Sequence, residues 1–155
     1  MELFQDYEEL LSAFNCHGVK YLVIGAYAVS YYTEPRFTKD IDLWVRPDAG
    51  NAKRIFHALA EFGAPLRNVH ERDFATRGTV YQIGVAPVRI DIITDAGGMS
   101  FDAAWKKRTI ARYGKETANI IGKDELIITK QKAGRAQDVL DVAKLQKPTR
   151  VTRKK

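Results

Sequence analysis

The sequence predicts an α/β (α+β) fold in which helices flank a mixed, twisted β-sheet. Short apolar runs with strand-like composition alternate along the chain with amphipathic stretches of helical period. Glycines follow or divide several of these segments, as they do at helix ends and in hairpins. The chain has 155 residues, of which 45% are hydrophobic and 28% charged, as in a globular domain with one core.

Helical periodicity is clearest at the start of the chain and after the second strand. Leu10, Leu11 and Phe14 share one face of a predicted helix that ends before Gly18. A second amphipathic helix ends before Gly63. The predicted helices cover residues 6–17, 27–32, 49–62, 101–107, 123–131 and 135–146.

Strand-like runs are rich in Val, Ile, Leu and Tyr. The last two bracket Gly114 and are predicted to form a hairpin. The predicted strands cover residues 19–26, 41–46, 79–84, 88–94, 108–113 and 117–121.

Composition favours a cytoplasmic protein with no membrane association. The longest apolar stretch, Tyr21 to Val29, is shorter than the about 20 residues that span a bilayer. The first residues lack the order of a secretory signal, and the single cysteine, Cys16, cannot form an internal disulfide.

The net charge of +6 comes mainly from the C-terminus. Residues 147–155 contain five basic side chains and no acid, and the remainder of the chain has 20 basic and 19 acidic residues. We therefore expect one domain over residues 1–146, with a helical C-terminal part at about 123–146. The last nine residues form either a solvated, disordered tail or an arm that neutralises phosphates.

Two acids stand at the start of the second predicted strand. Asp40 and Asp42 project from one face of that strand, whereas Ile41 and Leu43 project from the other. Their α-carbons lie about 6.6 Å apart at a rise of about 3.3 Å per residue. Two like charges at that separation repel by roughly 2–3 kcal/mol at an effective dielectric near 20. A cation between them would remove this cost, and Mg²⁺ prefers such oxygen ligands.

A third acid, Asp91, interrupts the apolar run from Val88 to Ile93. A carboxylate inside an apolar strand requires a partner or a metal ion. If this strand lies beside residues 41–46, Asp91 converges with the other two acids. It would then also be placed to accept a proton from an attacking hydroxyl group.

A glycine turn, Gly25-Ala26, separates the first strand from a short helix. Backbone N–H groups and the positive end of a helix dipole favour phosphates at such a turn. Arg36 could clamp the phosphates or the leaving group. Tyr27 belongs either to the core or to the nucleotide site, and Lys130 either contacts a phosphate or lies on a solvated helix face.

These motifs resemble the DNA polymerase β-like nucleotidyltransferases, and within them the minimal bacterial, AbiEii-toxin-like group. The first part of the resemblance is Gly25-Ala26-Tyr27-Ala28 followed by Arg36, Thr38, Asp40 and Asp42. The second part is Asp124-Glu125-Leu126-Ile127 with Lys130, then Ala133-Gly134-Arg135, Asp138 and Asp141. One departure is Ala26, where the family usually has Gly or Ser, so the expected hold on the phosphates differs there.

The resemblance implies a polymerase-β-type fold and transfer of a nucleoside monophosphate to a hydroxyl group. Asp40, Asp42 and Asp91 would be the catalytic residues and would bind two Mg²⁺ ions, with Mn²⁺ as an alternative. The donor would be a nucleoside triphosphate, ATP or CTP, and the acceptor RNA such as tRNA, a protein or a small molecule. Several members are toxins with an antitoxin partner. The implied nucleotide-binding residues are Gly25, Ala26, Tyr27, Arg36, Thr38 and Lys130.

Two other functions are compatible with the sequence. One is a catalytically silent member that only binds a nucleotide or a protein partner, although all three acids are present. The other is an RNA-binding module that uses the basic tail, whose binding would depend on salt but not on magnesium. A surface ladder formed by Arg135, Asp138 and Asp141 is the structural interpretation favoured for those acids.

Overall fold

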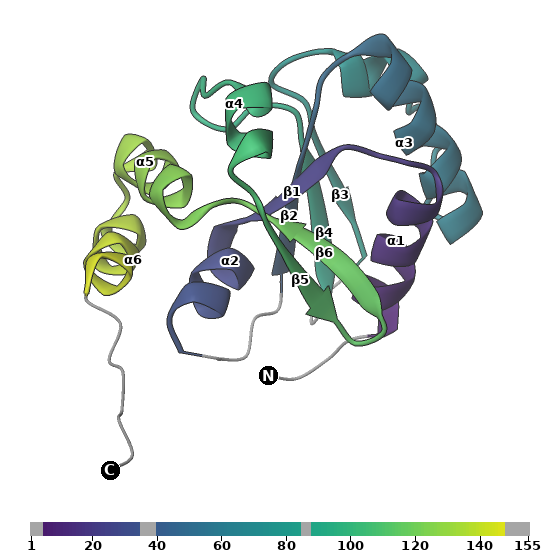
Figure 1. The fold of residues 1–155 in the computed structure, drawn as a ribbon. Helices are drawn as coiled ribbons and strands as arrows, with labels where there is room; N and C mark the ends of the chain where they lie inside the picture. The colour runs from purple at the N-terminus through teal and green to yellow at the C-terminus, as the bar shows by residue number, and fades with distance from the viewer. Residues whose placement is uncertain (1–4, 35–39, 85–87, 148–155) are drawn as a thin grey trace.

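A six-stranded mixed sheet forms the centre of the computed structural model, which describes residues 5–34, 40–84 and 88–147 (Figure 1). The strand order is β3-β4-β2-β1-β6-β5. The strands are β1 (Tyr21–Ile24), β2 (Asp40–Val45), β3 (Val80–Ile83), β4 (Arg89–Ile93), β5 (Thr109–Tyr113) and β6 (Glu116–Ile120). β2 pairs in parallel with β4 and β1 with β6, whereas the other neighbours are antiparallel. The predicted mixed α/β fold is confirmed.

Helices pack around this sheet at the positions that the sequence predicted. α1 and α3 pack against each other on one side, and α2 packs on β1 and β2 (Figure 1). α5 and α6 form a helical pair at the edge of the molecule, next to α2. The helices are α1 (Gln5–Cys16), α2 (Gly25–Tyr32), α3 (Ala49–Phe62), α4 (Phe101–Lys106), α5 (Lys123–Ala133) and α6 (Ala136–Gln146), with a short 3-10 helix, η1 (Glu71–Ala75).

Local capping signals explain why α3 has the predicted bounds. The Asp48 carboxylate accepts a hydrogen bond from the backbone N–H of Asn51 at 2.8 Å. At the other end, Gly63 adopts a left-handed conformation with φ of +90°. Between these caps, Ile55 and Leu59 are fully buried against the core.

The first strand is shorter than predicted, because Gly25 ends it. β1 stops at Ile24, and α2 begins at Gly25, which has a φ of +71°. Side chains on both faces of β1 are buried, so this strand runs through the centre of the core. The change from strand to helix at this residue places the glycine turn next to β2.

Candidate active site

The pairing of β2 with β4 places Asp42 directly beside Asp91. These two strands are neighbours in the sheet and run parallel, so equivalent side chains project from the same face. Asp40 lies two residues earlier on β2, on the face that Asp42 occupies, and is paired in register with Arg89. The expected adjacency of the two strands is therefore present in the structure.

The acid pair is electrostatically strained without a counter-ion. Burial and the adjacent Asp91 carboxyl group raise the pKa of Asp42 to about 7, and the charge of Asp40 adds to this effect. Lys130 acts in the opposite direction and lowers the pKa of Asp42. Two carboxyl groups this close together disfavour the ionisation of both. A bound cation would make the doubly ionised state favourable again.

The side chains present fit a divalent metal ion. The Oδ1 atom of Asp91 is buried and has no hydrogen-bond partner in the described structure. An orphaned carboxylate oxygen beside a second carboxylate is a set of hard oxygen donors suited to Mg²⁺ or Mn²⁺. Within residues 5–34, 40–84 and 88–147, however, no three Asp, Glu, His or Cys side chains are already grouped as metal ligands. Asp40 therefore lies on the same face as Asp42 and Asp91, but the three carboxylates do not form a ready metal-ligand cluster.

Gly25 allows the backbone to approach the Asp42 carboxylate closely. A β-carbon at position 25 would collide with Asp42 Oδ2, and the left-handed φ disfavours any side chain there. The first N–H groups of α2, from Gly25 and Ala26, have no acceptor within the helix. The start of α2 thus combines N–H donors that have no acceptor in the helix with an adjacent acid pair.

A cavity of about 340 Å³ opens beside Asp42 and Gly25. Another part of its wall is formed by Lys130 and Lys132 of α5, Arg135 between α5 and α6, and Asp138 of α6. Three basic side chains against one acid leave this part of the wall cationic. Pockets for small ligands typically start at about 300 Å³. The cavity therefore joins a carboxylate wall to a cationic wall, as a metal-bound polyphosphate requires.

Lys130 is held in a buried ion cluster between the two C-terminal helices. Its Nζ atom lies 3.2 Å from Asp138 Oδ1 and 3.2 Å from Asp141 Oδ2. Arg135 also donates to Asp138 at 2.7 Å, and this contact is the largest cause of the lowered pKa of Asp138. Both acids are 1% exposed and Lys130 is 9% exposed. The predicted pair of Arg135 with Asp138 forms, and Arg135 is exposed. The predicted surface position of the two acids and the solvated face for Lys130 are wrong, because packing of α5 on α6 removes these three side chains from solvent.

The remaining predicted nucleotide-binding residues have different locations. Tyr27 is buried, and its ring packs on that of Tyr113 with centroids 5.6 Å apart. Burial is also the main cause that raises the pKa of Tyr27 to about 12. The structure thus places Tyr27 in the core, one of the two locations considered for it. Arg36 and Thr38 lie outside the described residues.

Sequence reasoning did not identify Tyr7, which reaches the acid-bearing strands from α1. Its hydroxyl group donates to the backbone carbonyl of Arg89 at 3.1 Å. Burial is the main cause that raises the pKa of Tyr7, and the negative charge of Asp40 adds to it. An aromatic residue on an amphipathic helix is normally read as core, so the sequence held no signal for this contact.

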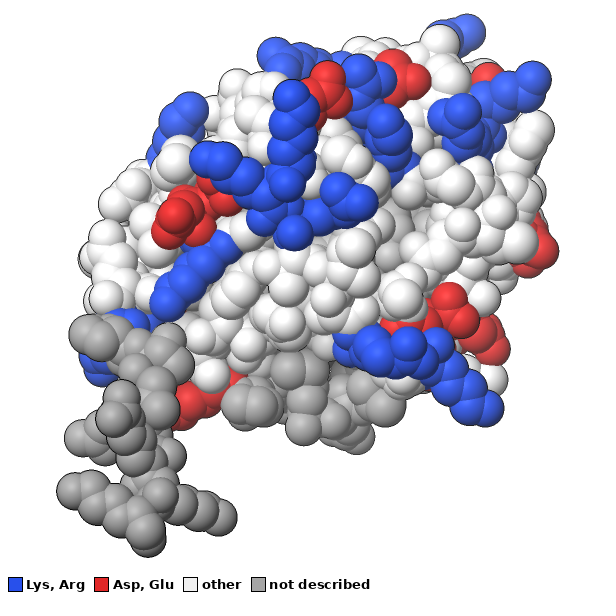
Figure 2. Space-filling view, viewed as in Figure 1, with Lys and Arg blue, Asp and Glu red and all other residues white. Residues whose placement is uncertain are grey.

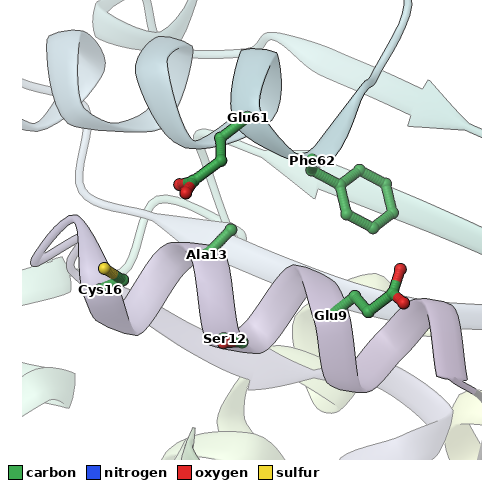
Figure 3. Close-up of a pocket in the computed structure, with 6 residues that line it drawn as sticks. All are labelled: Glu9, Ser12, Ala13, Cys16, Glu61 and Phe62. Carbon is green, nitrogen blue, oxygen red and sulfur yellow. The ribbon is translucent and has the colours of Figure 1, made fainter.

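A second cavity, of about 320 Å³, lies between α1 and α3 and is far less suited to phosphate chemistry (Figure 3). Its two carboxylates are already engaged, Glu9 by Gln5 and Glu61 by His17. No Lys or Arg lines it among the described residues. We therefore place the candidate active site at Asp42.

Comparisons with solved structures support this fold. The chain is similar to the lincosamide antibiotic adenylyltransferase LnuA in its lincomycin-bound form, with a TM-score of 0.59, 15% identity, and coverage of 94% of this chain and 98% of that one. It is similar to a protein from Thermotoga maritima that is proposed to be a nucleotidyltransferase, with a TM-score of 0.60, 13% identity, and coverage of 92% of this chain and 94% of that one. The chain has a nucleotidyltransferase fold.

A third similar structure is an antigenic nucleotidyltransferase-like protein from Paracoccidioides brasiliensis, with a TM-score of 0.58, 13% identity, and coverage of 92% of this chain and 77% of that one. No family model matches the sequence, and no curated protein matches it. The AbiEii-like subgroup therefore remains a prediction from the sequence motifs. No helix in the described parts of the chain is long and apolar enough to cross a membrane.

Proposed function

We propose that the protein is a nucleotidyltransferase that moves a nucleoside monophosphate from a nucleoside triphosphate, ATP or CTP, to an acceptor hydroxyl group. The observation that carries this proposal is the pairing of Asp42 with Asp91 beside Gly25, at the cavity with the cationic wall. Two acids that raise each other's free energy in the free protein, beside a cavity lined by Lys and Arg side chains, suit a metal-assisted polyphosphate reaction.

Asp42 and Asp91 would hold Mg²⁺ or Mn²⁺, with Asp40 as a further ligand. When bound, the metal ions would neutralise the charge that develops on the transferring phosphoryl group. Asp91 would also accept the proton of the attacking hydroxyl group, because its Oδ1 atom has no other partner in the described structure.

The rest of the cavity would position the triphosphate. The N–H groups of Gly25 and Ala26 would donate to phosphate oxygens at the start of α2. Lys130 would present a fixed positive charge, since Asp138 and Asp141 hold its ammonium group. Lys132 and Arg135 would add charge at the mouth of the cavity and stabilise the departing pyrophosphate.

We leave the acceptor open among RNA such as tRNA, a protein and a small molecule. LnuA is an adenylyltransferase for lincosamide antibiotics, which favours including small molecules in the search. The motif resemblance to AbiEii-type toxins favours including tRNA and looking for an antitoxin partner.

Two measurements test the proposal. Mg²⁺ and ATP or CTP together should raise the thermal unfolding temperature, because a ligand at about 100 times its Kd stabilises the native state by about 2.7 kcal/mol. Label from the α-phosphate should then be transferred to RNA, protein or small-molecule acceptors.

Asp42→Asn and Asp91→Asn should abolish transfer, whereas Asp6→Asn, at an exposed acid on α1, should not. Nucleotide binding without any transfer would favour the catalytically silent alternative. Transfer at the wild-type rate by Asp91→Asn would remove Asp91 from the catalytic residues.

A further inference from the structure

α6 buries two acids and exposes two large apolar residues, although it also buries Leu145. Its carboxylates, Asp138 and Asp141, point inward and are 1% exposed. Val139 and Leu140 point outward and are 62% and 59% exposed. Surface helices normally bury their apolar stripe and present their charges to water. Lys130 explains the inward direction of the acids, but packing within the described part of the chain does not explain the outward apolar residues.

The surface around these apolar residues is basic. Asp138 and Asp141 are the only acids in residues 126–147, so this segment exposes no carboxylate. In Figure 2 the left side of the molecule, where α5 and α6 lie in Figure 1, is largely uncharged, with both basic and acidic side chains around it. Four basic residues of the segment are exposed, Lys132, Arg135, Lys144 and Lys147. Lys132 and Arg135 line the candidate active-site cavity, whereas Lys144 lies in the last turn of α6 and Lys147 at its C-terminal cap.

The position of α6 leaves this face accessible. The helix packs on α5 and makes a smaller contact with α2, and it lies at the edge of the molecule (Figure 1). Ile128 of the neighbouring α5 is also 41% exposed. A contiguous exposed apolar patch that polar residues surround is typical of an interaction site.

We propose that the outer face of α6, centred on Val139 and Leu140, binds an acidic amphipathic helix of a partner protein. The apolar pair supplies the buried centre of such a contact, and Lys144 and Lys147 supply a basic rim that complements acidic side chains. A helix laid along another helix through apolar positions three or four residues apart fits this geometry.

Charge favours this occupant over two others. A second copy of the chain would bring two basic rims together, and like charges facing each other across an interface oppose association. RNA would engage the basic rim but would leave Val139 and Leu140 without apolar partners, since phosphate contacts dominate RNA affinity.

The test uses the full-length protein and two helix-stabilised, fluorescent peptides of about 18 residues, or roughly five turns. Both peptides carry Leu on one face, and one has Glu and the other Lys on the flanking positions. We expect saturable binding of the Glu peptide and binding of the Lys peptide that is weaker by at least about tenfold. Fluorescence anisotropy measures both affinities.

Two matched variants locate the binding face. Leu140→Glu should weaken binding of the Glu peptide by about tenfold or more, because the substitution removes an apolar anchor and adds charge repulsion. Ile110→Glu should bind as the wild type does, since Ile110 is equally exposed, at 62%, but lies on β5. Both positions are exposed, so far-UV circular dichroism should confirm that each variant is folded. Leu140→Ser provides a second variant that carries no new charge.

Equal binding of the two peptides, no saturable binding, or binding unaffected by Leu140→Glu would overturn the proposal. A concentration-dependent dimer that Leu140→Glu dissociates in sedimentation would assign the face to a second copy instead. Single-stranded RNA that competes with the Glu peptide, and whose affinity falls with Lys144→Glu but not with Leu140→Ser, would assign it to RNA.

Discussion

The carboxylate of Asp42 occupies the space that a β-carbon on Gly25 would need. This relationship ties the acid of β2 to the first residue of α2, so the proposed metal ligand and the proposed phosphate-binding turn cannot vary independently. Glycine is required at this position for two reasons. One is the left-handed φ of the backbone, and the other is the close approach of the Asp42 carboxylate.

Gly25→Ala should therefore destabilise the protein by more than backbone strain alone. The strain of a left-handed non-glycine residue is about 1–3 kcal/mol, and the collision with Asp42 adds to it. Gly18→Ala is the matched control, because Gly18 has a φ of +68° and a β-carbon there would meet no atom within 4 Å. Urea denaturation of both variants measures the difference, and equal losses of stability would show that Asp42 moves aside freely.

Asp42→Asn should stabilise the metal-free protein in a pH-dependent way. The pKa of Asp42 rises from 3.8 to about 7 on folding, so the native state binds a proton more tightly than the unfolded state. The wild type therefore loses stability as the pH rises from about 4 to about 7, whereas the Asn variant lacks this titration.

The gain of the Asn variant should be near zero at pH 4 and about 1–3 kcal/mol above pH 7, since partial exposure screens the effect. Thermal unfolding in EDTA across this range provides the measurement. Adding Mg²⁺ should reverse the order, because the wild type alone gains the stabilisation of a bound ligand. A gain that is independent of pH would contradict the assignment to the Asp42 carboxyl group.

The sequence predicted the acid-bearing strands but not the ion cluster of the helical pair, and the reason is physical. Strand alternation and the apolar residues around Asp42 and Asp91 determine which face each acid occupies, so their approach needed only neighbouring strands. For Asp138 and Asp141, a spacing of three along a helix is equally compatible with an exposed ladder and a buried cluster. Only the packing of α5 on α6, which brings Lys130 inside, distinguishes the two.

The limits of local signals are also visible at Asp40 and Tyr27. Alternation places Asp40 on the face of Asp42, but it does not determine whether three carboxylates gather without a cation. Tyr27 follows the glycine turn in sequence, yet its ring packs on Tyr113 of β5, more than 80 residues away. Such contacts between distant segments depend on the complete sheet.

Lys130→Met should be among the most damaging single changes outside the acid pair. It leaves Asp141 and Asp138 buried without their shared cation, and breaking a buried ion pair costs about 3–5 kcal/mol. Lys132→Met, at an exposed lysine two residues later on α5, should cost little. Adding Asp141→Asn to Lys130→Met should restore part of the stability, because it removes one of the two buried negative charges that shared the lysine. Equal stability of the two Met variants would show that the cluster is not energetically coupled.

The C-terminal tail provides a prediction that distinguishes the acceptor classes. Residues 148–155 lie outside the described structure, and Lys147 caps α6. A truncation after Lys147 therefore keeps the helix cap and removes Arg150, Arg153, Lys154 and Lys155. Nucleotide binding should be unchanged, because the cavity is lined by residues of the folded chain such as Gly25, Asp42 and Lys130.

With RNA as the acceptor, the truncated protein should bind it more weakly and with a flatter salt dependence. For a single strand, the slope of log K against log salt falls by about 0.7 for every phosphate that the tail no longer neutralises. Binding of RNA and of nucleotide should be measured separately at low and moderate salt for both proteins. Identical salt slopes would show that the four basic residues do not bind phosphates. Absence of RNA binding in both proteins would direct the acceptor search to proteins and small molecules, because the cationic wall of the cavity would then serve the triphosphate alone.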